Sequence, residues 1–223
     1  MTRVVAVVPM RHSSERVIGK NYRDLAGKPL YHHIVDTLLH VPEVDEVVID
    51  TDSPVIIDDA ALHFPTVRVL LRPAHLRAGE TPMNTVLLNT ISQVDADVVL
   101  QTHSTNPFLS AAVLGEALRH FLSGGEEIDS VFGVTRIQAR LWNKEGQPLN
   151  HDPAVLLRTQ DLPPVYLENS CFYIFTPAVL VSGGNRIGPN KAMHEVPQAE
   201  ALDIDEESDF ELAIAVAEMR AKK

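Results

Sequence analysis

The stretch Val4–Asn21, VVAVVPMRHSSERVIGKN, joins a continuous apolar run to a loop of basic and small polar residues. The run Val4–Pro9 is rich in β-branched residues, which is typical of a strand buried on both faces of a parallel sheet. Parallel α/β sheets bind ligands beyond the carboxyl ends of their strands, and this loop begins at such an end. Three cations follow there: Arg11, Arg16 and Lys20. We therefore expect a negatively charged ligand above the first strand.

The loop has the chemistry of a phosphate site. Ser13 and Ser14 are small enough to let backbone N–H groups approach a phosphate, while the cations neutralise its charge. A solvated basic loop is the alternative. The chain contains neither of the two common glycine-rich nucleotide loops, G-x-x-x-x-G-K-[ST] and G-x-G-x-x-G. From the residues alone, the prediction is binding of a phosphorylated ligand.

Further apolar runs alternate with helical patterns along the first half of the chain. The runs are at residues 44–50, 67–71 and 97–101, and the helical patterns at 30–39, 55–62, 85–94 and 111–122. This alternation predicts βαβ units, and therefore an α/β fold of three layers, Rossmann-like, with a mainly parallel sheet. Ser53 followed by Pro54 predicts the start of the second helix.

The pattern of alternating runs ends after Gly124-Gly125, although residues 129–137 could form another strand. Residues 138–168 are rich in Pro, Asn, Asp and Gly, which predicts a small excursion, a hairpin or arm, within one domain spanning residues 1–223. Its apolar residues could form a surface shared between two subunits, so a homodimer is a hypothesis. These residues are Leu141, Trp142, Leu162 and Val165. A strand from Glu168 and a short helix follow, and residues 206–222 predict a final helix.

Composition limits the function classes. The net charge of −11 argues against a nucleic-acid binder, which needs cations to neutralise phosphates. No apolar run approaches the length of a membrane span, so no membrane partner is expected. Cys171 is the only cysteine, which leaves no disulfide framework and makes a cytoplasmic location the default. It lies in an apolar strand and is interpreted as core packing.

Three aspartates precede the final helix in the segment LDIDEESD. Asp203 and Asp205 alternate, so in an extended chain they point to the same side and could share a divalent cation with phosphate oxygens. The alternative is that Asp205 and its neighbours cap the helix. Asp209 is expected to belong to the helix. The residues alone do not separate the two interpretations.

Other polar residues follow the predicted strands directly. Arg72 ends the run at 67–71 and could contact phosphate or pair with a carboxylate in the following AGE segment. Thr81 and Asn84 could contact a ligand or cap the next helix. A polar cluster after the run at 97–101 suits hydrogen bonding to a sugar. It comprises Gln101, His103, Ser104, Thr105 and Asn106.

The opening of the chain resembles the acylneuraminate cytidylyltransferases, the CMP-sialic acid synthetase family. Their signature is approximately I-P-A-R-x-x-S-[KE]-R-x-x-x-K-N followed by L-x-G-K-P-L. Met10 replaces a usually small residue, and Glu15 stands where many members carry lysine. The resemblance continues in VVIDTDS, LLRPAHLRAGETPMN, LQTHSTNPFL, ENSCFYIF and ALDIDEESDFELA. The matching residues of the opening are Pro9, Arg11, Ser14, Glu15, Arg16, Lys20, Asn21, Leu25, Gly27, Lys28, Pro29 and Leu30.

The resemblance implies a nucleotidyltransferase fold, a homodimer, and transfer of CMP from CTP to a sialic-type (nonulosonic) 2-keto sugar acid with release of pyrophosphate. It implies Mg²⁺ held by Asp203 and Asp205, and catalytic roles for Arg11 and Lys20. The implied nucleotide-binding residues are Arg11, Ser14, Arg16, Lys20, Asn21, Arg72, Thr81 and Asn84. The expected sugar-binding residues are Gln101, Ser104, Thr105, Arg158 and Asn169.

Two other function classes stay open at this point. The segment VVIDTDS also fits a magnesium-dependent phosphatase, in which a strand ends in D-x-D, although it follows the second predicted strand and Pro54 comes directly after it. A nucleotide-binding module without catalysis is the other class, and Glu15 in place of lysine favours it. If the protein is a cytidylyltransferase, the related enzyme to exclude is a KDO cytidylyltransferase.

Overall fold

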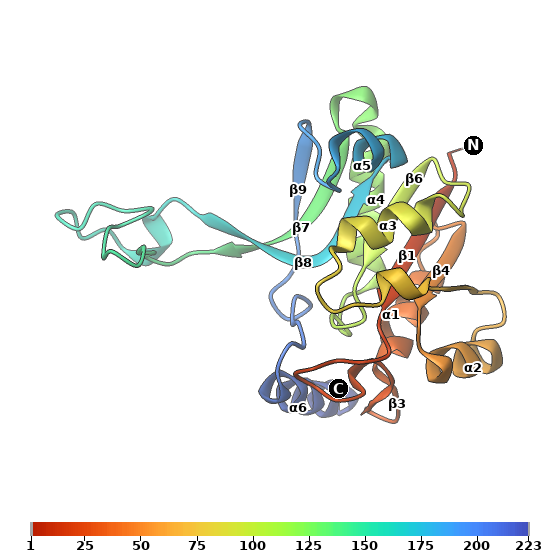
Figure 1. The fold of residues 1–223 in the computed structure, drawn as a ribbon. Helices are drawn as coiled ribbons and strands as arrows, with labels where there is room; N and C mark the ends of the chain where they lie inside the picture. The colour runs from red at the N-terminus through yellow and green to blue at the C-terminus, as the bar shows by residue number, and fades with distance from the viewer. Residues whose placement is uncertain (1, 223) are drawn as a thin grey trace.

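The computed structural model describes residues 2–222, which fold around a twisted sheet (Figure 1). Within these residues seven strands form the sheet in the order β5-β4-β1-β6-β8-β7-β9. The strands are β1 (Val4–Met10), β4 (Glu46–Thr51), β5 (Arg68–Leu71), β6 (Val98–Thr102), β7 (Ser130–Ile137), β8 (Val165–Phe175) and β9 (Lys191–Glu195). The α/β class predicted from the alternating runs is confirmed.

The sheet is mainly parallel. β1 pairs in parallel with β4 on one side and β6 on the other, and β4 continues in parallel to β5. β8 is the exception, because it runs antiparallel to both β6 and β7. Every residue of β1 is buried, as its continuous apolar sequence predicts. The carboxyl ends of β1, β4, β5 and β6 therefore meet at one edge of the sheet.

Helices cover both faces of the sheet. The helices are α1 (Leu30–Leu39), α2 (Pro54–His63), α3 (Met83–Ile91), α4 (Ala111–Ser123), α5 (Pro177–Gly183) and α6 (Glu207–Ala221). α1, α2 and α4 pack on one face, and α3 and α5 on the other, each over its own apolar cluster. Ser53 caps α2 through a 3.3 Å bond from the Ile56 N–H, with Pro54 at the first helical position.

Some elements were not predicted from the sequence. β9 has alternating exposed and half-buried residues and forms an edge of the sheet beside β7. A two-stranded ladder, β2 (Asp24–Leu25) with β3 (Lys28–Pro29), follows the first loop. Short 3₁₀ helices complete the chain: η1 (Lys20–Tyr22), η2 (Ala74–Leu76), η3 (Gly125–Glu127) and η4 (Thr159–Asp161).

The final helix packs through a narrower face than its apolar pattern suggests. Phe210, Ala213 and Ala217 of α6 are buried in a small cluster with the loop after β1. Leu212 and Met219 are 54% and 62% exposed. This packing places the start of α6, and the aspartates before it, beside the first loop, although the two segments are at opposite ends of the chain (Figure 1).

Residues 138–164 connect β7 to β8 and project away from the body as an arm (Figure 1). The two strands pair along the base of the arm, from Val134 opposite Glu168 to Ile137 opposite Val165. Farther out, Trp142 forms a bridge with Pro148. Large apolar side chains of the arm face solvent, including Leu149 at 63% and Leu156 at 91% exposure.

Candidate active site

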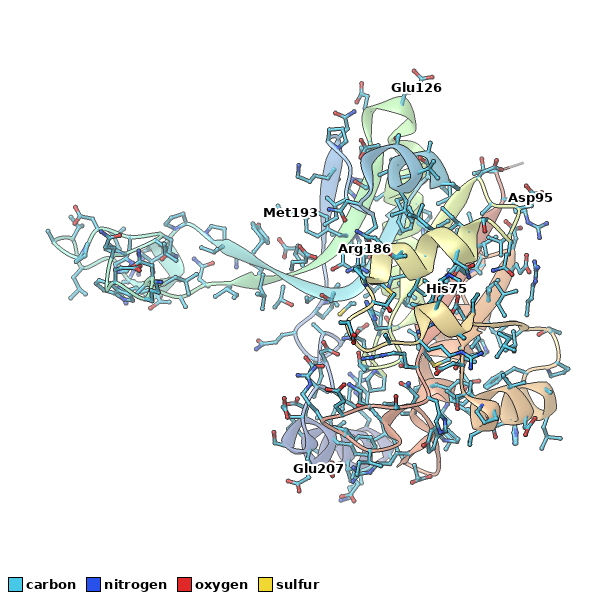
Figure 2. All side chains as sticks on the ribbon, viewed as in Figure 1. His75, Asp95, Glu126, Arg186, Met193 and Glu207 are labelled. Carbon is cyan, nitrogen blue, oxygen red and sulfur yellow. The ribbon has the colours of Figure 1, made fainter. Side chains whose placement is uncertain are left out.

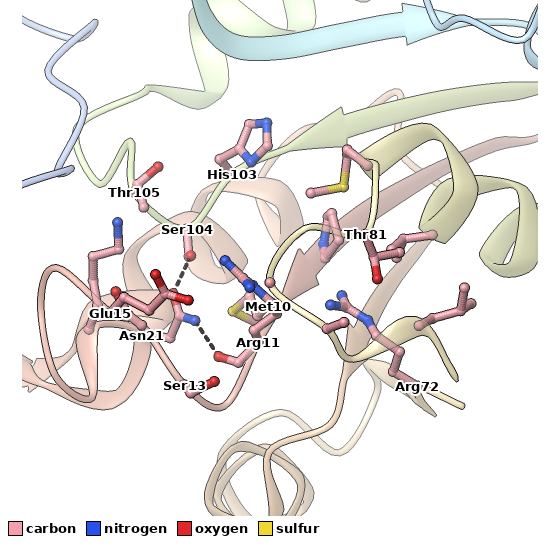
Figure 3. Close-up of a pocket in the computed structure, with 18 of the residues that line it drawn as sticks. Met10, Arg11, Ser13, Glu15, Asn21, Arg72, Thr81, His103, Ser104 and Thr105 are labelled. Atoms are coloured by element: carbon pink, nitrogen blue, oxygen red, sulfur yellow. Dashed lines mark hydrogen bonds between the residues drawn. The ribbon is translucent and has the colours of Figure 1, made fainter. Parts of the chain in front are cut away.

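A cavity of about 630 Å³ opens at the carboxyl edge of the parallel strands (Figure 3). The loop after β1 forms its base and carries Arg11. The turn after β6, with His103 and Thr105, forms one side, and Arg72 after β5 lies on the other (Figure 3). The cavity thus spans the edge of the sheet where α/β proteins bind ligands.

Asn21 holds the loop after β1 in its curved form. Its Nδ2 donates a 2.8 Å bond to the Arg11 carbonyl, and its Oδ1 accepts a 2.7 Å bond from the Ser104 hydroxyl. Asn21 therefore connects the loop after β1 to the turn after β6 and shapes the cavity.

Gly19 allows the turn before Asn21. It has a φ of 65°, a left-handed conformation that glycine adopts without strain. A side chain at this position would also meet the Tyr22 ring at 2.8 Å.

Cations of this loop lie against the acidic segment before α6. Lys20 Nζ donates a 2.6 Å bond to the Ile204 carbonyl and lies 3.8 Å from Asp205 Oδ1. Arg16 lies 2.8 Å from Asp205 and 3.1 Å from Glu206. Burial lowers the pKa of Lys20, although the Asp205 charge opposes that change. The two ends of the chain thus place cations and carboxylates at one site.

Asp203 is the more buried of the two candidate metal ligands. Burial raises its pKa, with a hydrogen bond from Thr105 opposing the rise. Its Oδ1 atom is buried and has no hydrogen-bond partner among residues 2–222. Asp203 also lines a second cavity, of about 480 Å³, together with Asn169. In residues 2–222 no group of three or more His, Cys, Asp or Glu residues is arranged to hold a metal.

The capping interpretation applies to other residues than Asp203 and Asp205. The N-cap of α6 is Glu206, and Asp209 completes a capping box with it. Asp209 Oδ2 accepts bonds of 2.7 Å from the Glu206 N–H and 3.0 Å from the Asp205 N–H. These backbone bonds lower the pKa of Asp209. Asp209 therefore belongs to the helix, as expected, while the carboxylates of Asp203 and Asp205 are not used as caps.

Arg72 lies on the cavity wall but is already paired within the protein. Its Nε donates a 2.6 Å bond to Asp50 Oδ1, and its Nη2 donates a 3.1 Å bond to the Asp50 carbonyl. Thr90 donates to the other carboxylate oxygen at 2.6 Å. The ion pair is almost fully buried, with 2% exposure at Arg72 and none at Asp50. A carboxylate in the AGE segment was one expected partner of Arg72, and the partner is Asp50 instead.

Thr81 and Asn84 differ in position. Thr81 lines the large cavity within the loop that precedes α3. Asn84 lies on α3 and donates a 3.0 Å bond to the Gly184 carbonyl, on the segment after α5. Neither caps α3, since its N-cap is Pro82 and no side chain bonds its first turn. Gly79, in the same loop, approaches Arg11 and Glu15 so closely that a Cβ would lie about 3.0 Å from both.

The polar cluster after β6 is divided between the cavity wall and the layer behind it. His103, Ser104 and Thr105 line the cavity. Gln101 is buried behind them, where it accepts a 2.8 Å bond from Arg186 and donates to His103 at 2.9 Å. Burial and the charges of Arg186 and Lys20 lower the pKa of His103 to about 4. His103 belongs to the polar cluster expected from the sequence but was not among the predicted sugar-binding residues.

The remaining candidates lie farther away. Asn169 lines the second cavity, donates a 3.1 Å bond to Thr135 and accepts a 3.2 Å bond from the Cys171 N–H. Arg158 is on the arm, where it pairs with Asp161 at 2.6 Å and is 73% exposed. The large cavity therefore brings together the candidates Arg11, Ser14, Arg16, Lys20, Asn21, Arg72, Thr81, Ser104 and Thr105. Within the described residues, six candidates are not among those that line it: Asn84, Gln101, Arg158, Asn169, Asp203 and Asp205.

Comparison with known proteins shows the family of the chain. A family model described as cytidylyltransferase matches residues 5–222, which is nearly the whole chain. The chain belongs to the cytidylyltransferase family. The resemblance drawn from the opening loop is confirmed, and this cytidylyltransferase is a nucleotidyltransferase.

Several curated relatives are similar over most of the chain. The CMP-N,N'-diacetyllegionaminic acid synthase of Legionella pneumophila is 28% identical, over 97% of each chain. A pseudaminic acid cytidylyltransferase of Campylobacter jejuni is 26% identical, over 94% of each. The N-acylneuraminate cytidylyltransferase of Oncorhynchus mykiss is 30% identical, over 94% of this chain and 49% of its own.

Solved structures share the fold. A CMP:2-keto-3-deoxy-manno-octonic acid synthetase complexed with CTP has a TM-score of 0.71 and 17% identity, with both chains fully covered. A 4-diphosphocytidyl-2C-methyl-D-erythritol synthase from Anaerococcus prevotii has a TM-score of 0.67 and 13% identity, covering 97% of this cytidylyltransferase and 96% of that chain. The nucleotidyltransferase fold expected from the resemblance is confirmed. No helix formed by residues 2–222 is long and apolar enough to cross a membrane.

Proposed function

We propose that this cytidylyltransferase transfers CMP from CTP to a nonulosonic, sialic-type 2-keto sugar acid and releases pyrophosphate. The observation that carries the proposal is the meeting of the cationic loop with the acidic segment before α6. Lys20 Nζ lies 3.8 Å from Asp205 Oδ1 at the edge of the large cavity. The names of the similar synthases and cytidylyltransferases support this class of sugar acid.

The large cavity suits a nucleoside triphosphate. Its volume of about 630 Å³ is within the range of small-molecule sites. We assign the triphosphate to the loop after β1, where Arg11, Arg16 and Lys20 supply positive charge. We assign the base and ribose to the side of β5, where Arg72 and Thr81 supply polar contacts.

The reaction requires little covalent chemistry from the protein. An oxygen of the sugar acid's anomeric hydroxyl attacks the α-phosphorus of CTP, the bond from that phosphorus to the bridging oxygen breaks, and pyrophosphate leaves with the electron pair. Placing the nucleophile in line and neutralising the phosphates provide most of the catalysis. Arg11 and Lys20 would stabilise the charge on the leaving pyrophosphate. The hydroxyl proton goes to solvent, since no side chain is assigned as general base.

The residues present fit a magnesium ion. Asp203 offers a buried carboxylate oxygen that has no hydrogen-bond partner in the described part of the chain, and Asp205 nearby is half exposed. Mg²⁺ is commonly held by one or two carboxylates together with substrate phosphates and water, so a third protein ligand is not required. Asp203 and Asp205 would hold the ion, which would supply charge neutralisation at the phosphates and acidify the attacking hydroxyl.

The sugar acid would occupy the side of the cavity toward β6 and β8. Ser104 and Thr105 line the large cavity there, and Asn169 lines the neighbouring one. Gln101 and Asn84 would support the residues that line the cavity and would not contact the sugar acid directly, since each side chain hydrogen-bonds within the protein. Arg158 lies on the arm, which projects away from the cavity of the same subunit. Arg158 could therefore bind the sugar acid only if the arm of one subunit reached the cavity of a second subunit. We propose that the exposed apolar residues of the arm form this homodimer contact.

An assay of pyrophosphate release with CTP, Mg²⁺ and a panel of nonulosonic acids and KDO tests the proposal. We expect turnover with at least one nonulosonic acid, a slower reaction with KDO, and a CMP-sugar detected by mass spectrometry. CTP binding without turnover across the panel would favour the binding module. Release of phosphate from a simple phosphoester would favour the phosphatase, although Asp50 of that motif is fully buried against Arg72.

A further inference from the structure

Arg186, outside the predicted site, makes contacts that fix a side chain on the cavity wall. It lies in the segment between α5 and β9, beside the carboxyl end of β6 (Figure 2). Its guanidinium carbon lies 3.7 Å from the centroid of the Tyr173 ring, a cation–π contact. Tyr173 is itself held by a 2.5 Å bond from its hydroxyl to Glu168. None of the salt bridges among residues 2–222 involves Arg186.

A second set of contacts holds the backbone of the segment between α5 and β9, which carries Arg186. Asn84 of α3 donates to the Gly184 carbonyl at 3.0 Å, and Gly184 adopts the left-handed conformation that ends α5. Arg186 is therefore anchored from α3 on one side and from β8 on the other. Its Nη1 points to Gln101 Oε1, which it reaches at 2.8 Å.

The chemistry of these groups determines where each proton lies. Arginine only donates hydrogen bonds, so the Gln101 amide must present its oxygen to Arg186 and its NH₂ group to the other side. That Nε2 atom lies 2.9 Å from His103 Nε2 and 3.1 Å from the Thr102 carbonyl. Because Gln101 Nε2 donates, His103 Nε2 must accept and carries no proton. The proton of the neutral ring is then on Nδ1.

The surroundings of His103 favour the same state. Burial and the neighbouring Arg186 and Lys20 charges lower the pKa of His103 to about 4, which keeps the ring neutral at pH 7. Within the described residues, Nδ1 forms no hydrogen bond, and it is not sealed from solvent. His103 also lines the large cavity beside Ser104 and Thr105. An Nδ1–H group is thus available to a ligand there.

We propose that Arg186, acting through Gln101, is a positioning residue that fixes His103 as a donor of its Nδ1–H to an acceptor oxygen of the sugar acid. This inference rests on the proposed function for the identity of the ligand. The sugar acid is the ligand chosen because His103 follows β6, on the side of the cavity away from Arg72 and Thr81. A carboxylate or hydroxyl oxygen of the acid accepts such a bond, whereas a donor group at that position would be rejected.

The tautomer can be measured directly by long-range ¹H–¹⁵N correlation in protein labelled at histidine. His33 and His40 are internal references, since His33 Nε2 bonds the Leu25 carbonyl and His40 Nδ1 bonds the Asp36 carbonyl. We expect His103 in the Nδ1–H form in the wild type. In Gln101→Glu the side chain has only acceptors, so the proton moves to His103 Nε2. An Nε2–H wild type, or no change in Gln101→Glu, would overturn the proposal.

Kinetics give a second readout. His103→Phe removes the donor, and we expect the KM for the sugar acid to rise roughly tenfold or more while the KM for CTP changes less than about twofold. His103→Asn keeps an N–H near the same position and should recover part of the loss. Arg186→Gln should give a mixture of tautomers and a smaller rise in the same KM. Equal effects of His103→Phe on both KM values would contradict the proposal.

Different results would contradict the proposed function and the proposed role of His103. If no sugar acid reacts with the wild type, the proposed function fails, whereas the tautomer measured by NMR still decides the assignment of protons. If the wild type reacts but His103 is in the Nε2–H form, the proposed function stands, whereas the donor role of His103 Nδ1–H and the positioning role of Arg186 are both wrong.

Discussion

Lys20 Nζ, in the loop after the first strand, lies 3.8 Å from Asp205 Oδ1, in the segment before the last helix. The contact exists because α6 packs Phe210 against the loop region and brings the acidic segment with it. Lys20 also bonds the Ile204 carbonyl at 2.6 Å, so its position does not depend on the Asp205 carboxylate. A cation for the phosphates and a carboxylate for a metal are therefore fixed at one edge of the cavity.

The first prediction concerns Asp205. Asp205→Asn removes a carboxylate proposed to hold Mg²⁺, and we expect kcat for pyrophosphate release to fall about 100-fold or more. The circular dichroism spectrum should be unchanged, because Asp205 is half exposed. Glu207→Gln is the matched control, since Glu207 has similar exposure and pairs with Arg23 at 2.6 Å. Full activity of Asp205→Asn would exclude this residue from the metal site.

The second prediction concerns Lys20. Lys20→Met removes a largely buried cation at the proposed pyrophosphate position, so kcat/KM for CTP should fall roughly 100-fold in initial-rate assays. Lys144→Gln removes a lysine that is 91% exposed on the arm, and its kcat/KM for CTP should stay unchanged. An equal effect of both substitutions would indicate a general response to net charge.

The third prediction concerns the buried ion pair of Asp50 and Arg72. Asp50→Asn leaves the Arg72 charge buried without its partner, which we expect to lower the free energy of unfolding by about 3–5 kcal/mol. Urea denaturation measures this change. Asp161→Asn breaks the exposed pair with Arg158 and should cost less than about 1 kcal/mol. A small effect of Asp50→Asn would mean that water or another group compensates Arg72.

The fourth prediction concerns pH. The pKa of His103 is about 4 in the folded protein and about 6.5 in an unfolded chain, so the unfolded state binds the proton first as the pH falls. Stability should therefore decrease from about pH 6.5 to 4, with a slope of up to about 1.4 kcal/mol per pH unit from this group. Below pH 4 both states are protonated and the contribution ends. His103→Asn should show a flatter profile in thermal melts over that range.

The fifth prediction concerns the arm. Light scattering should give the mass of a dimer for the wild type, and Leu156→Glu should shift it toward a monomer, because Leu156 is 91% exposed on the arm. Leu62→Glu places the same charge on α2, at a residue that is 77% exposed, and should leave the mass unchanged. A monomeric wild type would contradict the proposed contact.

The sequence allowed the βαβ core to be predicted well. The helix expected at residues 30–39 has those bounds in the structure, and β1 extends one residue beyond its predicted end. Both have strong local patterns that do not depend on distant neighbours. β9 was missed because a short edge strand with mostly exposed residues has no such pattern.

Some site residues could not be paired from sequence. Asp50 and Arg72 meet because β4 and β5 run in parallel with Asp50 opposite Leu70, and that register is a property of the sheet. Arg186 meets Gln101 only through the chain path after α5. The polar type of each residue was visible in the sequence, but its partner was not.

The most direct test of the central claim is a single-turnover measurement with CTP, a nonulosonic acid and Mg²⁺, comparing the wild type with Asp205→Asn. The account predicts that the wild type forms one CMP-sugar for each pyrophosphate released, and that Asp205→Asn binds CTP but forms both products about 100-fold more slowly or slower still. Phosphate instead of pyrophosphate, or equal rates of product formation in both proteins, would contradict it.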